Sequence, residues 1–497
     1  MLKNINSRTI KIVVSTLVLY IASCTKKDFD INSPNPNQPS EVTPDFVLSA
    51  ALTSTANIVF GGNGNFANFW MGYWAPYGEQ SPTVLSYKLT TDSYAKNWDD
   101  AYVTLENFKF IEDESRLPEN GYFLAIAKVM KSFLYQRLVD LYNNIPYADA
   151  LYSTNPFPKY DSAQAVYNAL IVQLDSATTI INQTDVATAN NPAASDVMFG
   201  GDMTKWVKFI NTLKLKILMR LTSQPGGEEY IKSHLTGYTT DDFFGVGEDA
   251  TINPGYSNSS SAQQSPLWRN VGYNTDGSPS GGYLYTRANS YAVDFYLNNN
   301  DLRVGQFYDT NAFGEYRGRA FGSSDVGQGN SVISGFGSGI LASATMDAFI
   351  IPAFESLFLQ SEAVLRGYIS GDASQLFKNA VTESFRILNV PDYVSAAQTY
   401  YSQANDKVNI DVSSNKLNTI IVQKWAASNA YDPLESYSDW RRLGIPADLP
   451  VSEYPGTTAT HIPYRLLYPT SEYSYNRANV NDQGEINQFT SKIFWMP

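Results

Sequence analysis

The sequence is poor in the residues that carry most covalent and metal chemistry. It has one cysteine and two histidines, His234 and His461, in 497 residues. A single cysteine excludes an intramolecular disulfide, and the lack of HExxH, CxxC and Cys–His patterns argues against a zinc site or a thiol nucleophile. The GxSxG and GxxxxGK[ST] patterns are missing as well. Carboxylates are plentiful, so the sequence does not exclude a glycosidase, whose two catalytic carboxylates lie about 5 to 10 Å apart.

Positive charge and long apolar runs are also scarce. Lys plus Arg number 35 against 48 Asp plus Glu, which gives a formal net charge of −13. Such a surface repels phosphate backbones, so we expect no nucleic-acid partner. The uncharged run 12–22 is too short to cross a bilayer core of about 30 Å as a helix. With 43% apolar residues, the chain can nevertheless bury a large core.

The amino-terminal end has the features of a secretory signal. Three basic residues precede the run 12–22, and small residues lead directly to Cys24. The Ile-Ala-Ser-Cys ending resembles a bacterial lipobox, whose cysteine becomes the first residue of the mature chain and carries the acyl groups. The alternative is an ordinary signal peptide beside a buried cysteine. We favour lipidation of Cys24, because the only cysteine stands at the cleavage position.

Three segments follow from this reading. Residues 1–23 are predicted to be a lipoprotein signal peptide. Residues 24–43, rich in Pro, Asn and Ser, are predicted to form an extended tether with nothing to bury. Residues 44–497 are predicted to form the folded domain.

Helical periodicity dominates the folded part. In 353–369, the spacing of apolar residues predicts a buried face that includes Leu357, Phe358 and Leu365. Pairs of helices with short connections are typical of tetratricopeptide-like repeats. The predicted pairs are 98–113 with 121–141, 163–182 with 203–222, 353–369 with 373–388, and 414–429 with 433–442.

Loop-rich regions with many aromatic residues separate these pairs, at 251–285, 313–340 and 444–490. Long ordered loops are usually functional. Sugar rings present flat C–H faces that pack on indole and phenol rings. The alternative for Trp70 and Trp74, four residues apart, is one packed face of a helix, and for Trp268 it is plain packing. The candidate ligand-binding residues are Trp268, Tyr273, Tyr283, Trp70, Trp74 and Tyr77.

The stretch FESLFLQSEAVLRGY (354–368) resembles the helix motif of the SusD/RagB family of Bacteroidetes surface lipoproteins. In that motif Glu362 and Arg366 stand four apart and are predicted to pair. Trp440, Arg441 and Arg442 are predicted to join helices and loops rather than to contact ligand. Further segments agree with the family in the expected order: 141–151, 301–309, 420–446, 462–480 and the terminal IFWMP.

The resemblance implies a mostly α-helical SusD-like fold, with four tetratricopeptide-like helix pairs as scaffold and loop-rich insertions. It implies a lipid-anchored outer-membrane protein that binds a nutrient, commonly a glycan, at the cell surface. Its partner would be a SusC-type TonB-dependent transporter, and it would need no catalysis and no cofactor. The alternatives are a surface glycoside hydrolase, a peptide-binding member of the family, and a helical-repeat scaffold.

Overall fold

The computed structural model describes residues 42–77, 82–324 and 331–497. Cys24, the expected signal peptide and most of the expected tether lie outside the described residues. Residues 44–497 group into one compact unit by their contacts.

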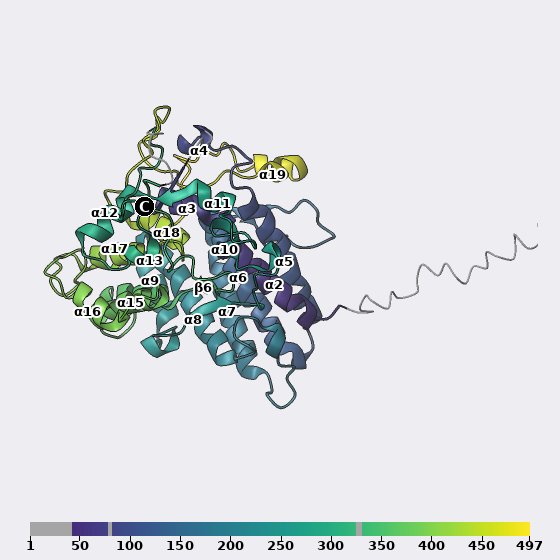
Figure 1. Cartoon of the computed structure of the whole chain (residues 1–497). Coiled ribbons are helices and arrows are strands. Elements are labelled where there is room, and N and C mark those ends of the chain that lie inside the picture. Colours follow the sequence, from purple (N-terminus) through teal and green to yellow (C-terminus); the bar gives the residue numbers. More distant parts are fainter. Residues whose placement is uncertain (1–41, 78–81, 325–330) are drawn as a thin grey trace, which may run out of the picture. The chain divides into compact units, whose positions relative to one another are not determined.

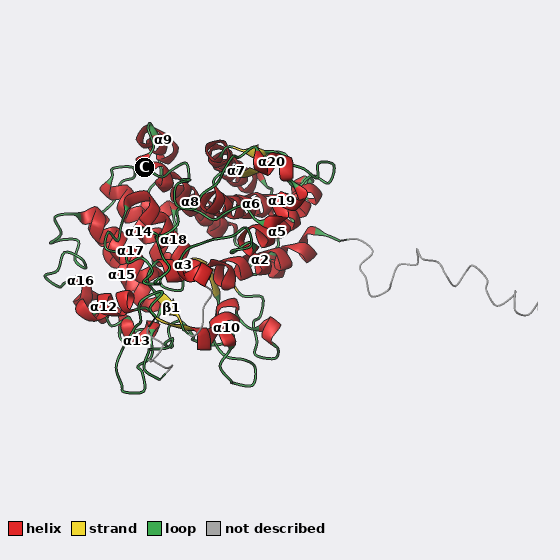
Figure 2. Ribbon diagram, turned by 90° about the horizontal axis from the view of Figure 1, so that it is seen from above, coloured by secondary structure: helices red, strands yellow, loops and turns green. Residues whose placement is uncertain are grey.

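Long α-helices form the scaffold of this unit (Figure 1). Figure 2 shows α5 to α8 together in one part of the unit and α14, α15, α17 and α18 in another. The longer helices are α2 (Pro44–Phe60), α5 (Lys96–Glu114), α6 (Gly121–Tyr142), α7 (Ala163–Gln183), α8 (Met203–Arg220), α14 (Ala353–Leu365), α15 (Ala373–Ile387), α17 (Lys416–Ser428) and α18 (Pro433–Leu443). Shorter helices are α3 (Asn65–Trp70), α4 (Pro82–Leu85), α9 (Gly227–Leu235), α10 (Pro266–Val271), α11 (Gly281–Tyr285), α12 (Ser290–Asn298), α13 (Val304–Phe307), α16 (Tyr393–Tyr401), α19 (Thr470–Tyr475) and α20 (Arg477–Asn481).

Side-chain caps fix where several of these helices begin. Asp202 accepts hydrogen bonds from the backbone N–H groups of the first turn of α8, and Asp372 does the same for α15. Asp432 caps α18, whose first residue is a proline. Such caps satisfy donors that have no partner within the helix. The sequence thus encodes the helix starts locally.

The predicted helix pairs are confirmed. Helix α5 contacts α6, α7 contacts α8, α14 contacts α15, and α17 contacts α18. Neighbouring pairs also touch, because α6 packs against α7 and α14 against α17. This stacking buries a continuous core, as expected of tetratricopeptide-like units.

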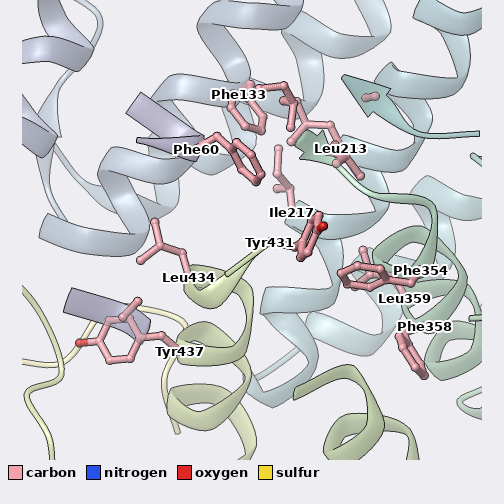
Figure 3. Close-up of a cluster of buried hydrophobic side chains, with 14 of the residues drawn as sticks. Phe60, Phe133, Leu213, Ile217, Phe354, Phe358, Leu359, Tyr431, Leu434 and Tyr437 are labelled. Atoms are coloured by element: carbon pink, nitrogen blue, oxygen red, sulfur yellow. The ribbon is translucent and has the colours of Figure 1, made fainter. Parts of the chain in front are cut away.

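Large apolar side chains from several helices meet in that core (Figure 3). Phe354 of α14 lies near Tyr431 and Ile217 of α8. Phe358 is fully buried, and its ring centroid lies 5.9 Å from that of Phe377 on α15. Leu365 was expected on the same buried face but is 37% exposed, and it is the last residue of α14.

Short strands connect distant parts of the unit in three antiparallel ladders within the described residues. Strand β1 (Trp74–Pro76) pairs with β5 (Thr286–Ala288), so that Trp74 lies opposite Ala288. The other two ladders are β2 (Ile145–Pro146) with β3 (Tyr160–Asp161) and β4 (Ala250–Ile252) with β6 (Ala348–Ile351). The regions read as loops therefore contain short elements, including α10 and α11 in 251–285 and α19 and α20 in 444–490.

Candidate ligand-binding site

The β1–β5 ladder brings one candidate residue, Tyr77, to the part of the chain that carries another, Tyr283. Directly after β1, the backbone N–H of Tyr77 donates to the carbonyl oxygen of Tyr285, at 2.7 Å. Tyr285 ends α11, which also carries Tyr283. Tyr77 therefore lies beside α11, although about 200 residues separate them in the chain.

Trp268, Tyr273 and Tyr283 form a continuous row of rings, which we call the aromatic row. The ring centroids of Trp268 and Tyr273 lie 5.5 Å apart, and those of Tyr273 and Tyr283 lie 4.9 Å apart. All three side chains are partly exposed. Ser280 supports the row, because its hydroxyl accepts a hydrogen bond from the N–H of Tyr283 and so caps α11. Three of the six candidate residues thus share one surface.

Arg287, which the sequence reading missed, lies at the end of this row. Its guanidinium carbon is 5.2 Å from the centroid of the Tyr283 ring. Its Nη1 donates to the carbonyl oxygens of Thr286, at 2.8 Å, and of Tyr283. Burial lowers the pKa of Arg287, and burial together with a hydrogen bond to the Tyr273 hydroxyl raises the pKa of Tyr283 to about 12. Only the pairing of β5 with β1 makes Arg287 a neighbour of Tyr77, and no local pattern reveals that pairing.

Trp70 and Trp74 occupy a different environment. Both are buried, with 1% and 0% of their surface exposed. The Trp74 Nε1 donates to the side-chain oxygen of Asn429, at 3.0 Å. Neither ring offers an open face for stacking in this structure.

The alternative that Trp70 and Trp74 share one face of a helix is wrong, although both rings are buried. Helix α3 ends at Trp70, and Trp74 begins β1. Between them Gly72 has φ +72°, and a Cβ there would lie 2.8 Å from the Tyr291 ring. A glycine is needed for both reasons, and it stops the helix before Trp74.

The family-like motif residues pair with one another and join helices and loops, as predicted. Arg442 of α18 binds Glu362 of α14 at 2.7 Å and Asp439 at 2.8 Å. Glu362 also binds Arg366 at 2.7 Å across one helical turn. Arg441 donates to backbone carbonyl oxygens of Asp140 and Tyr464. These arginines join helices and loops, and they are structural.

A triad of buried carboxylates, Glu355, Asp432 and Glu435, has the donor set of a cation site. Their oxygens lie within 4.8 Å of one another. Lys216 Nζ lies 2.8 Å from Glu355, 3.4 Å from Asp432 and 3.2 Å from Glu435. The ammonium group of Lys216 therefore takes the place that a bound cation would take.

The charges in this triad divide unequally. Burial raises the pKa of Glu355 well above its usual range. Burial acts on Glu435 in the same direction, but Arg220, Lys216 and Lys424 outweigh it and hold the pKa of Glu435 well below its usual range. Glu435 is therefore held in its ionised form by the cations around it.

Two hollows of similar size lie away from the aromatic row. One, of about 480 Å³, is lined by side chains that include Tyr291, Phe295 and Asp448. The other, of about 500 Å³, lies among α5, α6 and α7 and is lined by charged residues together with tyrosine and aliphatic side chains. Among the helices of the described residues, none is both long and apolar enough to span a bilayer.

The architecture is that of SusD-like proteins of known structure. A SusD homologue from Bacteroides fragilis matches with a TM-score of 0.74 and 20% identity, over 92% of this chain and 99% of its own. A SusD-like protein from Bacteroides thetaiotaomicron matches with a TM-score of 0.71 and 22% identity, over 90% and 98%. A chitin-binding SusD homologue from Flavobacterium johnsoniae matches with a TM-score of 0.74 and 21% identity, over 90% and 98%.

The sequence identifies the family directly. Residues 36–469 match the SusD-like family model described as "Starch-binding associating with outer membrane". The chain belongs to this SusD-like family, as its motifs indicated. No curated protein matches the chain.

Proposed function

We propose that this protein is a cell-surface receptor that binds a glycan through the aromatic row. The observation that carries the proposal is the row itself: three partly exposed rings in contact, on short helices and loops outside the scaffold. Such rings stack on the C–H faces of sugars. Family membership and the chitin-binding relative of the same fold support a glycan as the ligand class.

The proposal also includes delivery of the bound glycan to a transporter. The protein would pass its ligand to a SusC-type TonB-dependent transporter in the outer membrane, to which acyl groups on Cys24 would hold it. The family description, with its association with the outer membrane, supports this location. Binding and release need no bond to be broken, so the proposal assigns the protein no catalytic residue.

Replacing Trp268 by alanine tests the ligand site. We expect the affinity for the bound oligosaccharide to fall by about 1 to 3 kcal/mol, because an aromatic anchor is lost. The measurement is titration calorimetry, with the tightest ligand from a set of soluble oligosaccharides of starch, chitin and pectin. Thermal unfolding should change little, since Trp268 is partly exposed.

Trp440→Ala is the matched control. Trp440 is the other partly exposed tryptophan, and it packs on α18 near Tyr464 rather than in the aromatic row. It should leave affinity unchanged. Equal affinity of Trp268→Ala and wild type would place the site elsewhere, for example at the hollow beside Tyr291. Cleavage of any oligosaccharide by the wild type would instead favour the hydrolase alternative.

Replacing Cys24 by serine tests the anchor. A serine has no thiol to acylate, so the chain should leave the membrane fraction and lack lipid by mass spectrometry. Stable anchoring requires more than one acyl chain, each contributing about 0.8 kcal/mol per buried CH₂. A variant that stays in the outer membrane with its lipid intact would contradict the proposal.

A further inference from the structure

Arg287 differs from every other buried arginine of the described chain. Arg220, Arg303 and Arg442 each form an ion pair with a carboxylate. Arg465 has no such pair, but it donates from two of its nitrogens to carbonyl oxygens. Arg441 likewise donates from several nitrogens. Arg287, which is 3% exposed, forms hydrogen bonds only through Nη1.

Two hydrogen-bond donors at the aromatic row and at Arg287 lack acceptors. The Arg287 Nε is buried without a hydrogen-bond partner, and so is the Nε1 of Trp268 at the other end of the aromatic row. A buried donor without an acceptor is costly, and a buried charge without a counter-charge is more so. The row therefore has a surplus of N–H groups and of positive charge.

The protein supplies no negative charge to balance Arg287 within the described residues. The side chains that affect the pKa of Arg287 are the phenols of Tyr283, Tyr77 and Tyr273. Asp276 and Asp309 lie in neighbouring loops and are exposed. The charge of Asp309 contributes to the raised pKa of Tyr283. The Asp276 carboxylate accepts hydrogen bonds from the backbone N–H and the hydroxyl of Ser278.

We propose that the aromatic row binds acidic glycans, and that Arg287 recognises an anionic group on the sugar. A guanidinium group binds carboxylate and sulfate oxygens through charge-assisted hydrogen bonds. The sugar ring stacks on the row while its acidic substituent meets Arg287. This inference deepens the proposed function and rests on it, because it assumes that the row is the glycan site.

The test compares ligands that differ only in charge. Trisaccharides of galacturonate and of mannuronate, and their methyl esters, are titrated into the wild-type protein. We expect at least one acid to bind about tenfold more tightly than its ester, since the ester keeps the ring but loses the charge. A sulfated galactose trisaccharide distinguishes the two anion sources: binding as tight as that of the best uronate indicates a general anion site, and weaker binding indicates a carboxylate site.

Arg287→Gln should remove the preference for the acid over its ester. Acid and ester should then bind equally, and the affinity for the ester should equal that of the wild type. Arg287→Lys keeps the charge without the planar fork and should retain part of the preference. Arg269→Gln is the control, because Arg269 lies on α10 next to Trp268, is exposed and bonds only to the neutral Asn57 among the described residues. It should leave the preference intact.

Two results would overturn the inference. If the wild type binds acids and esters equally, the row is a neutral-glycan site and the proposed function survives without the acidic specificity. If it binds no uronate, ester or sulfated sugar but does bind a starch or chitin oligosaccharide, the acidic class is again wrong. A failure to bind any of these oligosaccharides contradicts the proposed function itself. The comparison on wild type holds even if Arg287→Gln does not fold.

Discussion

Replacing Glu435 by glutamine is expected to lower the free energy of unfolding by about 3 to 5 kcal/mol, the usual cost of removing one partner of a buried ion pair. Glu435 is 1% exposed and contacts three cations. Its oxygens lie 2.5 Å from Arg220, 2.6 Å from Lys424 and 3.2 Å from Lys216. Glutamine has nearly the same shape but no charge, so the change isolates the electrostatic part. Chemical denaturation followed by tryptophan fluorescence measures it.

Glu248→Gln is the control for this experiment. Glu248 pairs with Lys208 at 2.8 Å, but both side chains are substantially exposed, at 35% and 26%. An exposed Lys–Glu pair contributes about 0 to 1 kcal/mol. A loss for Glu435→Gln no larger than that for Glu248→Gln would show that the buried network adds no stability beyond a surface pair.

Phe358→Ala is expected to cost a similar amount, about 3 to 5 kcal/mol, through lost burial and the cavity left behind. Phe358 is fully buried and packs against Phe377, so α14 and α15 would both lose contacts. The same unfolding measurement applies.

Leu365→Ala, on the same helix but 37% exposed, provides the comparison. A surface truncation of this kind changes stability by about 0.5 kcal/mol or less. If Phe358→Ala cost no more than Leu365→Ala, the packing of α14 against α15 described above would be incorrect.

The scaffold could be read from the sequence because its determinants are local. Apolar spacing predicted the helix pairs, and the ion pair of Glu362 with Arg366 follows from a separation of four residues. The exposure of Leu365 could not be predicted, because apolar periodicity does not show at which residue a helix ends. The partners of Lys216 could not be predicted either, since they lie on α14 and at the start of α18, far along the chain.

Part of the candidate site could be predicted for a related reason. Aromatic residues in loops pointed to Trp268, Tyr273 and Tyr283, and the structure places these rings in contact. The same rule also selected Trp70 and Trp74, because aromatic content does not separate a core ring from an open one. Arg287 was missed because an isolated arginine has no pattern, and its meaning arises from the missing counter-charge.

The β1–β5 ladder has a consequence for the order in which the chain folds. It joins Trp74 to Ala288, and the same tryptophan bonds to Asn429, 355 residues farther along the chain. Contacts over such separations form late, because long loops must close first. The ladder that places Tyr77 beside Arg287 is thus complete only when the amino-terminal, middle and carboxy-terminal parts have all met. Glycan binding would then report on a finished chain, and a truncated or partly folded copy would expose rings without a receptor surface.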